Sequence, residues 1–165
     1  MRIILKNKET LSYDDFEFKC SIGKKGTTSK KIEGDKKTPK GVYSLGDLFY
    51  RKDRVENPIT KLKKKEIRKF MGWCDEINRK NYNKLIKINK NNKCEKLYRS
   101  QENYDLLIPI NYNTLKIKKN KGSAIFLHIC KDDFSCTEGC VAIEKKVLLE
   151  LSKKINSQSS MIIEA

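Results

Sequence analysis

The chain's only histidine and one of its six cysteines stand close together near the C-terminal end. His128 precedes Cys140 by twelve residues, in the stretch IFLHICKDDFSCTEGC. A free cysteine is a weak nucleophile near neutral pH, because a pKa of about 8.5 leaves only a few per cent of it as thiolate. A nearby imidazole can take the thiol proton. The pair therefore predicts acyl transfer to a cysteine thiol.

The residues around the histidine predict a strand. In IFLHIC (125–130), aliphatic side chains alternate with Phe126, His128 and Cys130. This period of two is typical of a buried or half-buried strand. It places His128 on the face opposite the aliphatic side chains, together with Cys130.

The residues around the cysteine predict a turn followed by a helix. Gly139 allows a backbone conformation that a side chain would resist, so Cys140 can lie on a sharp turn. Backbone N–H groups around such a turn can converge on a developing oxyanion. An apolar stripe over residues 145–156 then predicts a helix that holds the turn against the core.

Two alternatives to thiol chemistry stay open for these residues. A lone histidine is often a satisfied core residue, and a Gly-Cys pair is often only a turn. A metal site is the second alternative, since His128, Cys130, Cys136 and Cys140 are four potential zinc ligands within thirteen residues. Their spacing lacks the Cys-x-x-Cys knuckles that structural zinc sites favour.

The stretch KGSAIFLHICKDDFSCTEGCVAI resembles the active-site segment of the YkuD-type L,D-transpeptidases, in which a strand histidine precedes a Ser/Thr-x-Gly-Cys motif. Three upstream segments also resemble the family, in the family's order: KKIEGDKKTPKGVYSLGDLFYRKDR, MGWCDEINRKNYNKLI and YDLLIPINYN. The resemblance covers about residues 20–155. It is closest to the compact branch that consists of a catalytic domain alone.

The resemblance implies roles for the residues of the motif. Cys140 would be the nucleophile, His128 the base that activates it, and Gly139 the residue that shapes the turn. The backbone N–H groups of Gly139 and Cys140 would form the oxyanion hole. Thr137 and Glu138 would contact substrate, although a threonine there can also simply cap the turn.

This chain departs from the family pattern at two positions. Glu138 stands where many members have histidine, and Ala142 where arginine or asparagine is frequent, which leaves recognition of a substrate carboxylate unassigned. Upstream, Trp73, Asp75, Tyr82 and Asn83 match the family and would frame the cleft, with a structural role favoured over substrate contact.

The activity implied by the resemblance is L,D-transpeptidation of peptidoglycan stem peptides, without metal or organic cofactor. Cys140 would attack the L-centre carbonyl of the diamino acid in a tetrapeptide stem and release the terminal D-alanine. An amine of another stem, a free D-amino acid or water would resolve the acyl-enzyme. An L,D-carboxypeptidase on the same scaffold is the nearer alternative, and a non-enzymatic basic or zinc-binding module the more distant one.

Length and pattern predict one domain over residues 1–165, mainly β with accessory helices (α+β), and the family fold is β-sandwich-like. β-Branched and aromatic content predicts six strands and a short closing strand at the C-terminus. The six strands span residues 2–5, 16–22, 41–46, 84–88, 104–110 and 123–129, and the helices span about 60–70 and 145–156.

A net charge of +16 predicts attraction to polyanions. The lysines are spread and no nucleic-acid motif accompanies them, so solvated charge from a biased composition is the favoured interpretation. Anionic cell-envelope polymers are the possible partners, and nucleic acid is not expected. No stretch of 18 apolar residues occurs, and the first residues lack the apolar region of a secretory signal. The family resemblance implies a periplasmic or extracytoplasmic location, with a cytoplasmic one left open. The irregular cysteine spacing favours free thiols.

Overall fold

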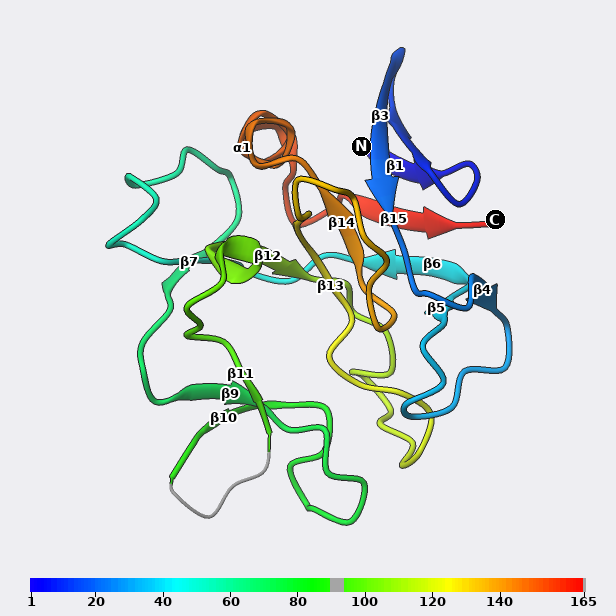
Figure 1. The fold of residues 1–165 in the computed structure, drawn as a ribbon, viewed down its shortest axis with the longest axis vertical. Helices are drawn as coiled ribbons and strands as arrows, with labels where there is room; N and C mark the ends of the chain where they lie inside the picture. The colour runs from blue at the N-terminus through cyan, green and yellow to red at the C-terminus, as the bar shows by residue number, and fades with distance from the viewer. Residues whose placement is uncertain (90–93, 165) are drawn as a thin grey trace.

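The computed structural model describes residues 1–89 and 94–164, which form mainly β-structure with one α-helix (Figure 1). Ten strands build one mixed sheet. In spatial order they are β6 (Gly41–Ser44), β15 (Ser160–Ile163), β1 (Arg2–Leu5), β2 (Thr10–Tyr13), β3 (Phe16–Ser21), β14 (Val141–Ile143), β13 (Phe126–Ile129), β12 (Leu106–Pro109), β7 (Leu48–Tyr50) and β8 (Lys64–Glu66).

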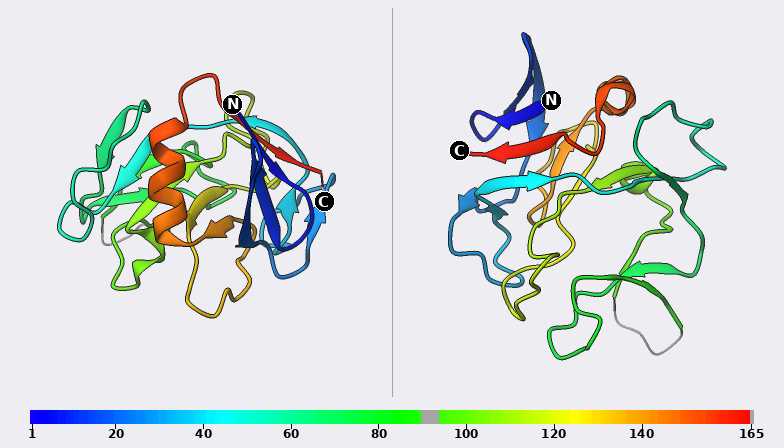
Figure 2. Two further views of the ribbon diagram at one scale, coloured as in Figure 1. Left: turned by 90° about the horizontal axis from the view of Figure 1, so that it is seen from above. Right: turned by 180° about the vertical axis from the view of Figure 1, so that it is seen from behind.

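Two smaller sheets and two helices complete the described part. One sheet has the order β10 (Leu85–Lys87), β9 (Met71–Trp73), β11 (Glu95–Lys96), and the other pairs β4 (Thr27–Thr28) with β5 (Thr38–Pro39). The helices are the 3₁₀ turn η1 (Glu102–Tyr104) and α1 (Lys145–Lys154). The N-terminal strands and the β9–β11 sheet lie at opposite ends of the molecule (Figures 1 and 2).

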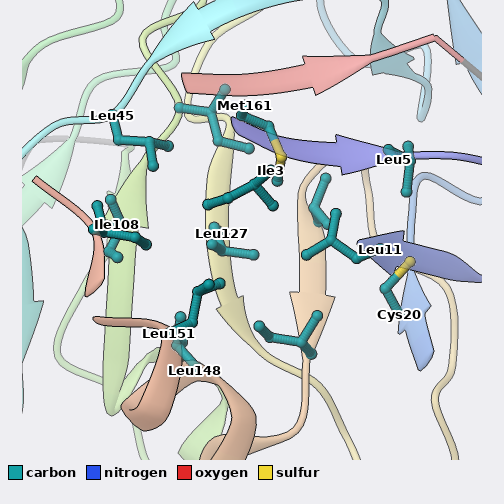
Figure 3. Close-up of a cluster of buried hydrophobic side chains, with 14 of the residues drawn as sticks. Ile3, Leu5, Leu11, Cys20, Leu45, Ile108, Leu127, Leu148, Leu151 and Met161 are labelled. Carbon is teal, nitrogen blue, oxygen red and sulfur yellow. The ribbon is translucent and has the colours of Figure 1, made fainter. Parts of the chain in front are cut away.

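The ten-stranded sheet curls around the main hydrophobic core. An isolated bridge between Leu45 and Ile110 joins the chain just after edge strand β6 to the chain just after β12. Side chains such as Ile108 and Leu127 point into the enclosed space, and Leu148 of α1 packs against them (Figure 3). Burying this apolar surface is the main stabilising contribution to the curled sheet.

The outer face of β13 is also buried. There Phe126 packs edge-on against Trp73, with 5.2 Å between ring centroids, and against Tyr104 at 5.7 Å. Both faces of β13 are therefore covered, one by the main core and one by a second cluster that includes Cys140. The chemistry-bearing residues belong to this second face.

The mainly-β fold class is confirmed, and so is the C-terminal helix, which is α1 (Lys145–Lys154). The predicted helix at 60–70 is wrong. Residues Lys64–Glu66 form β8, which pairs in parallel with β7, and the Ile67 N–H donates to the Tyr50 carbonyl at 2.8 Å. A helix there would stack like charges four residues apart, whereas the strand buries Ile67.

Strand boundaries were only partly predicted. The predicted strand at 104–110 begins instead with Tyr104 in η1, and the predicted strand at 123–129 is regular only from Phe126. Short strands such as β2, β7, β9 and β11 were not predicted, because segments of two to four residues show too little periodicity. Among the described residues no helix is both long enough and apolar enough to cross a membrane.

Candidate active site

Cys140 lies immediately before β14, on a turn that requires glycine. Gly139 has φ +139°, and a Cβ there would lie 2.9 Å from the Lys37 carbonyl oxygen. The Cys140 side chain is buried, with the residue 8% exposed. Its Sγ accepts a hydrogen bond from the Phe126 N–H and donates one to the Ala124 carbonyl, each at 3.3 Å. The start of β13 thus fixes the thiol.

Thr137 and Glu138 have different surroundings on this turn. The Thr137 hydroxyl donates to the Cys140 carbonyl at 2.7 Å and accepts from the Gly139 N–H at 3.1 Å. Glu138 forms an exposed ion pair with Lys36 at 3.2 Å. Because the Gly139 N–H is already bonded, the Cys140 N–H is the better candidate of the two for an oxyanion hole.

His128 lies on β13, on the same face as Phe126, and pairs in register with Ala142 of the parallel strand β14. Its Nδ1 lies 2.8 Å from the Ile129 carbonyl oxygen. A carbonyl oxygen can only accept a hydrogen bond, so Nδ1 must be the donor in this contact and carries the ring proton. In the neutral imidazole, Nε2 then has the free lone pair. The sequence-based prediction placed His128 on this face.

Burial lowers the pKa of His128 to about 4, and the positive charge of Arg99 acts in the same direction. Hydrogen bonds to the backbone of Ile129 and Asn103 oppose this shift but do not cancel it. The imidazole is therefore neutral at pH 7. A neutral imidazole is the form that can accept a proton.

Burial also raises the pKa of the Cys140 thiol, to about 12, and the negative charge of Glu95 adds to the effect. The Phe126 N–H and the Tyr104 side chain lower the pKa by hydrogen bonding, without overcoming burial. Both side chains are thus neutral at pH 7: Cys140 is a thiol and His128 an unprotonated imidazole. This differs from an ion pair of thiolate and imidazolium.

His128 and Cys140 line one cavity of about 620 Å³. Three other predicted site residues, Asp75, Thr137 and Glu138, also line it. Burial raises the pKa of Asp75, and the nearby charges of Glu33 and Glu76 act in the same direction, against a backbone hydrogen bond. The cavity therefore brings the predicted dyad together with Thr137 and Glu138 of the same turn and with Asp75 from a distant part of the sequence.

Trp73, Tyr82 and Asn83 lie behind the cavity wall and are buried. Asn83 has φ +56°, and its Oδ1 accepts from Trp73 Nε1 at 2.9 Å and from the Ala124 N–H at 3.1 Å. Its Nδ2 donates to two further backbone carbonyls, at 3.0 and 2.8 Å. Asn83 thus holds the Ala124 backbone, whose carbonyl accepts the hydrogen bond from the Cys140 thiol.

Among the site residues missed from the sequence are Glu95, Arg99 and Tyr104. The Tyr104 hydroxyl donates to the Glu95 carboxylate, and its ring meets His128 edge-on with 5.2 Å between centroids. Arg99 donates to Glu95 at 2.9 Å and stacks over Tyr104 at 4.0 Å. The three lie on β11, η1 and the segment between them; Tyr104 opens the family-like segment YDLLIPINYN but had no predicted role, and no motif marks Glu95 or Arg99.

A buried cation lies below the cysteine turn. Lys31 is 5% exposed, pairs with the Asp35 carboxylate, and lines the cavity. Although burial opposes it, hydrogen bonds from Lys31 and from the backbone of Ile32 and Lys37 lower the pKa of Asp35. Lys31 Nζ lies 3.6 Å from where a Cβ of Gly139 would be. A positive charge, paired with Asp35, therefore lies next to the glycine of the cysteine turn.

The four potential zinc ligands are not gathered in the structure. In the described part of the chain, no three His, Cys, Asp or Glu side chains lie close enough together to hold a metal ion. All six cysteines are free thiols, and Cys136 is exposed.

Asn103, which also lines the cavity, has a buried side-chain oxygen. Among the described residues, no group donates a hydrogen bond to this Oδ1.

The fold resembles a solved structure, and the sequence matches a family model. The solved structure of Bd1075 from Bdellovibrio bacteriovorus is similar in fold, with a TM-score of 0.51 and 18% sequence identity. The alignment covers 98% of this chain and 46% of that chain, so this chain spans under half the length of the solved protein. No curated protein matches in sequence. The family model for the YkuD L,D-transpeptidase catalytic domain matches residues 2–163, and the chain therefore belongs to this family.

Proposed function

We propose that the chain is a cysteine L,D-transpeptidase that acylates Cys140 with a peptidoglycan stem peptide. The observation that supports this most is the placement of Cys140 and His128. Both side chains line one cavity from the same face of β13 and β14, and the Phe126 N–H fixes the sulfur. Family membership makes a stem peptide the expected acyl donor.

In the proposed first step, His128 Nε2 takes the Cys140 proton while Sγ attacks the L-centre carbonyl of the donor. A C–S bond forms and the carbonyl oxygen becomes an oxyanion near the Cys140 N–H. The intermediate collapses as the C–N bond to D-alanine breaks. The imidazolium returns its proton to the leaving amine. The product is a thioester on Cys140.

In the second step, an acceptor resolves the thioester. A stem amine gives a cross-link, a free D-amino acid gives exchange, and water gives hydrolysis. His128 removes the acceptor proton and returns it to the sulfur as the C–S bond breaks. Hydrolysis is the L,D-carboxypeptidase alternative, and the same site serves it.

Charges on the cavity wall suit a donor that carries both carboxylate and ammonium groups. Ala142 replaces the family's frequent arginine or asparagine, but Lys31 and Arg99 supply positive charge to the same cavity. Glu33 and Asp75 supply negative charge on its wall. Lys31, next to Gly139, is the proposed partner of a donor carboxylate.

The test is mass spectrometry of disaccharide-tetrapeptide incubated with wild type, Cys140→Ala and Cys136→Ala. Wild type and the exposed-cysteine control Cys136→Ala should release D-alanine and show a transient acyl adduct. Cys140→Ala should do neither. Products of wild type identify the acceptor: dimers support transpeptidation, and tripeptide alone supports the carboxypeptidase. Turnover by a folded Cys140→Ala would refute the proposal.

The same proposal extends to location and to a second partner. Family members typically act outside the cytoplasm, where stem peptides and anionic envelope polymers occur together. The net charge of +16 would concentrate the protein on such polymers.

A further inference from the structure

Two cysteines outside the dyad lie where the β9–β11 pairing ends. Glu95 is opposite Trp73 and Lys96 is opposite Gly72, so one further step along the ladder puts Cys94 opposite Cys74. The Leu97 N–H donates to the Met71 carbonyl at 3.1 Å. Hydrogen-bonded and non-hydrogen-bonded pairs alternate along an antiparallel ladder, which makes Cys94–Cys74 a non-hydrogen-bonded pair.

This position has the geometry that a disulfide needs. Facing residues of a non-hydrogen-bonded pair have Cα atoms about 4.5 Å apart, and disulfides span Cα separations of about 4.4–6.8 Å. Cys94 Sγ lies over Gly72, where a Cβ would be only 2.6 Å from the sulfur. Because Gly72 has no side chain, the Cys94 sulfur can lie against this face of β9, which is the face that Cys74 shares two residues on.

The two thiols differ in access, which gives them different chemical roles. Cys74 is fully buried and Cys94 is half-buried. Burial raises the pKa of the Cys94 thiol, and the charges of Asp75 and Cys74 add to the effect. Cys94 is therefore the thiol that reacts first with an oxidant from solvent, and Cys74 is the thiol that reacts second.

We propose that Cys74 and Cys94 form an intramolecular disulfide when the chain meets an oxidising disulfide reagent. The Cys94 thiolate attacks the reagent, forms a mixed disulfide and expels one thiol. The Cys74 thiolate then attacks the Cys94 sulfur and expels the second thiol. Both cysteines are oxidised, the reagent is reduced to two thiols, and the two cysteine protons end on those thiols.

The disulfide would restrain one wall of the cavity. It links the residue directly after β9 to the residue directly before Glu95, whose carboxylate accepts hydrogen bonds from Tyr104 and Arg99. It would also close the segment of chain that carries Asn83. Loop closure of this length restricts the unfolded chain, and we expect the melting temperature to rise by about 5–10 °C. The disulfide does not depend on the proposed acyl transfer.

The test uses reduced wild-type protein incubated with oxidised glutathione, followed by alkylation of the remaining thiols and non-reducing peptide mapping. The expected product is a peptide pair linked through Cys74 and Cys94, lighter by two hydrogens than the reduced pair, together with the higher melting temperature. Cys94→Ser should lose both effects. Cys136→Ser, which removes an exposed thiol elsewhere, should keep both.

Three outcomes would overturn the inference: a stable glutathione adduct on Cys94, a link from Cys94 to another cysteine, or two thiols that stay reduced while Cys136 is oxidised. Because the readouts are mass and melting temperature, a protein without acyl-transfer activity can still pass this test. An active protein can equally fail it.

Discussion

The carbonyl oxygen of Ala124 accepts a hydrogen bond from the Cys140 thiol at 3.3 Å, although the two residues are sixteen positions apart. The Ala124 N–H is in turn held by Asn83 Oδ1 at 3.1 Å. The position of the Cys140 thiol therefore depends on a backbone segment before β13 and on an amide side chain from the segment between β9 and β10. A substitution that alters either of them should change the position of the thiol.

The pH at which activity is lost on the acid side should lie far below the ordinary pKa range of histidine. Since burial lowers the pKa of His128 to about 4, the imidazole stays neutral, and able to act as a base, until the pH falls towards 4. We expect kcat/KM for D-alanine release to be nearly constant from pH 7 to 5 and to fall below that. His128→Ala should reduce the rate by about 10²-fold or more. A half-maximal rate near the ordinary histidine pKa of about 6.5 would contradict the assignment.

Alkylation at pH 7 should reach Cys136 before Cys140. Cys136 is exposed, whereas Cys140 is buried with a pKa raised to about 12, so almost none of it is thiolate. Limiting iodoacetamide followed by peptide mapping measures the order. Cys136→Ser is the control that removes the competing thiol. If Cys140 reacts first, the dyad rests as an ion pair and the neutral description is wrong.

Tyr104→Phe and Glu95→Gln should shift the pKa of the Cys140 thiol in opposite directions. Tyr104 lowers the thiol pKa by hydrogen bonding, so its loss should raise that pKa and slow acylation. The charge of Glu95 raises the thiol pKa, so its removal should lower it. The pH dependence of Cys140 alkylation in each variant measures both. Shifts of the same sign would show that these residues only pack the site.

Asn83→Ala should destabilise the fold as well as the site. It leaves the Ala124 N–H and Trp73 Nε1 without an acceptor in a buried place, and we expect a loss of about 3 kcal/mol in unfolding free energy. Urea unfolding measures this loss, with Asn78→Ala, at an exposed position of the same segment, as the control. Equal stability of the two variants would remove Asn83 from its proposed positioning role.

Binding to isolated cell-wall sacculi should weaken steeply with salt. The net charge of +16 acts through the solvent, where the screening length is about 8 Å at physiological ionic strength and shorter above it. We expect binding to be at least about tenfold weaker at roughly 0.5 M than at roughly 0.05 M salt in a sedimentation assay. Sacculi stripped of anionic polymers are the control. Salt-independent binding would show that the excess of lysine does not attract the protein to anionic polymer and reflects only its composition.

The sequence by itself determined the parts of this protein that depend on neighbouring residues. The alternation in 125–130 placed His128 on one face of a strand, and the glycine before Cys140 marked the turn. The apolar stripe after it predicted α1 (Lys145–Lys154). Strand period, turn chemistry and helix period are each encoded within a few consecutive residues, so they can be read without the fold.

Only the tertiary structure decided what surrounds the dyad. Glu95, Arg99 and Tyr104 meet His128 and Cys140 because distant segments pack together, and no local pattern records that meeting. The same packing turned 64–66 into a strand beside β7. It also left the thiol neutral, since desolvation depends on every group packed around the sulfur and not on the residues next to it in the chain.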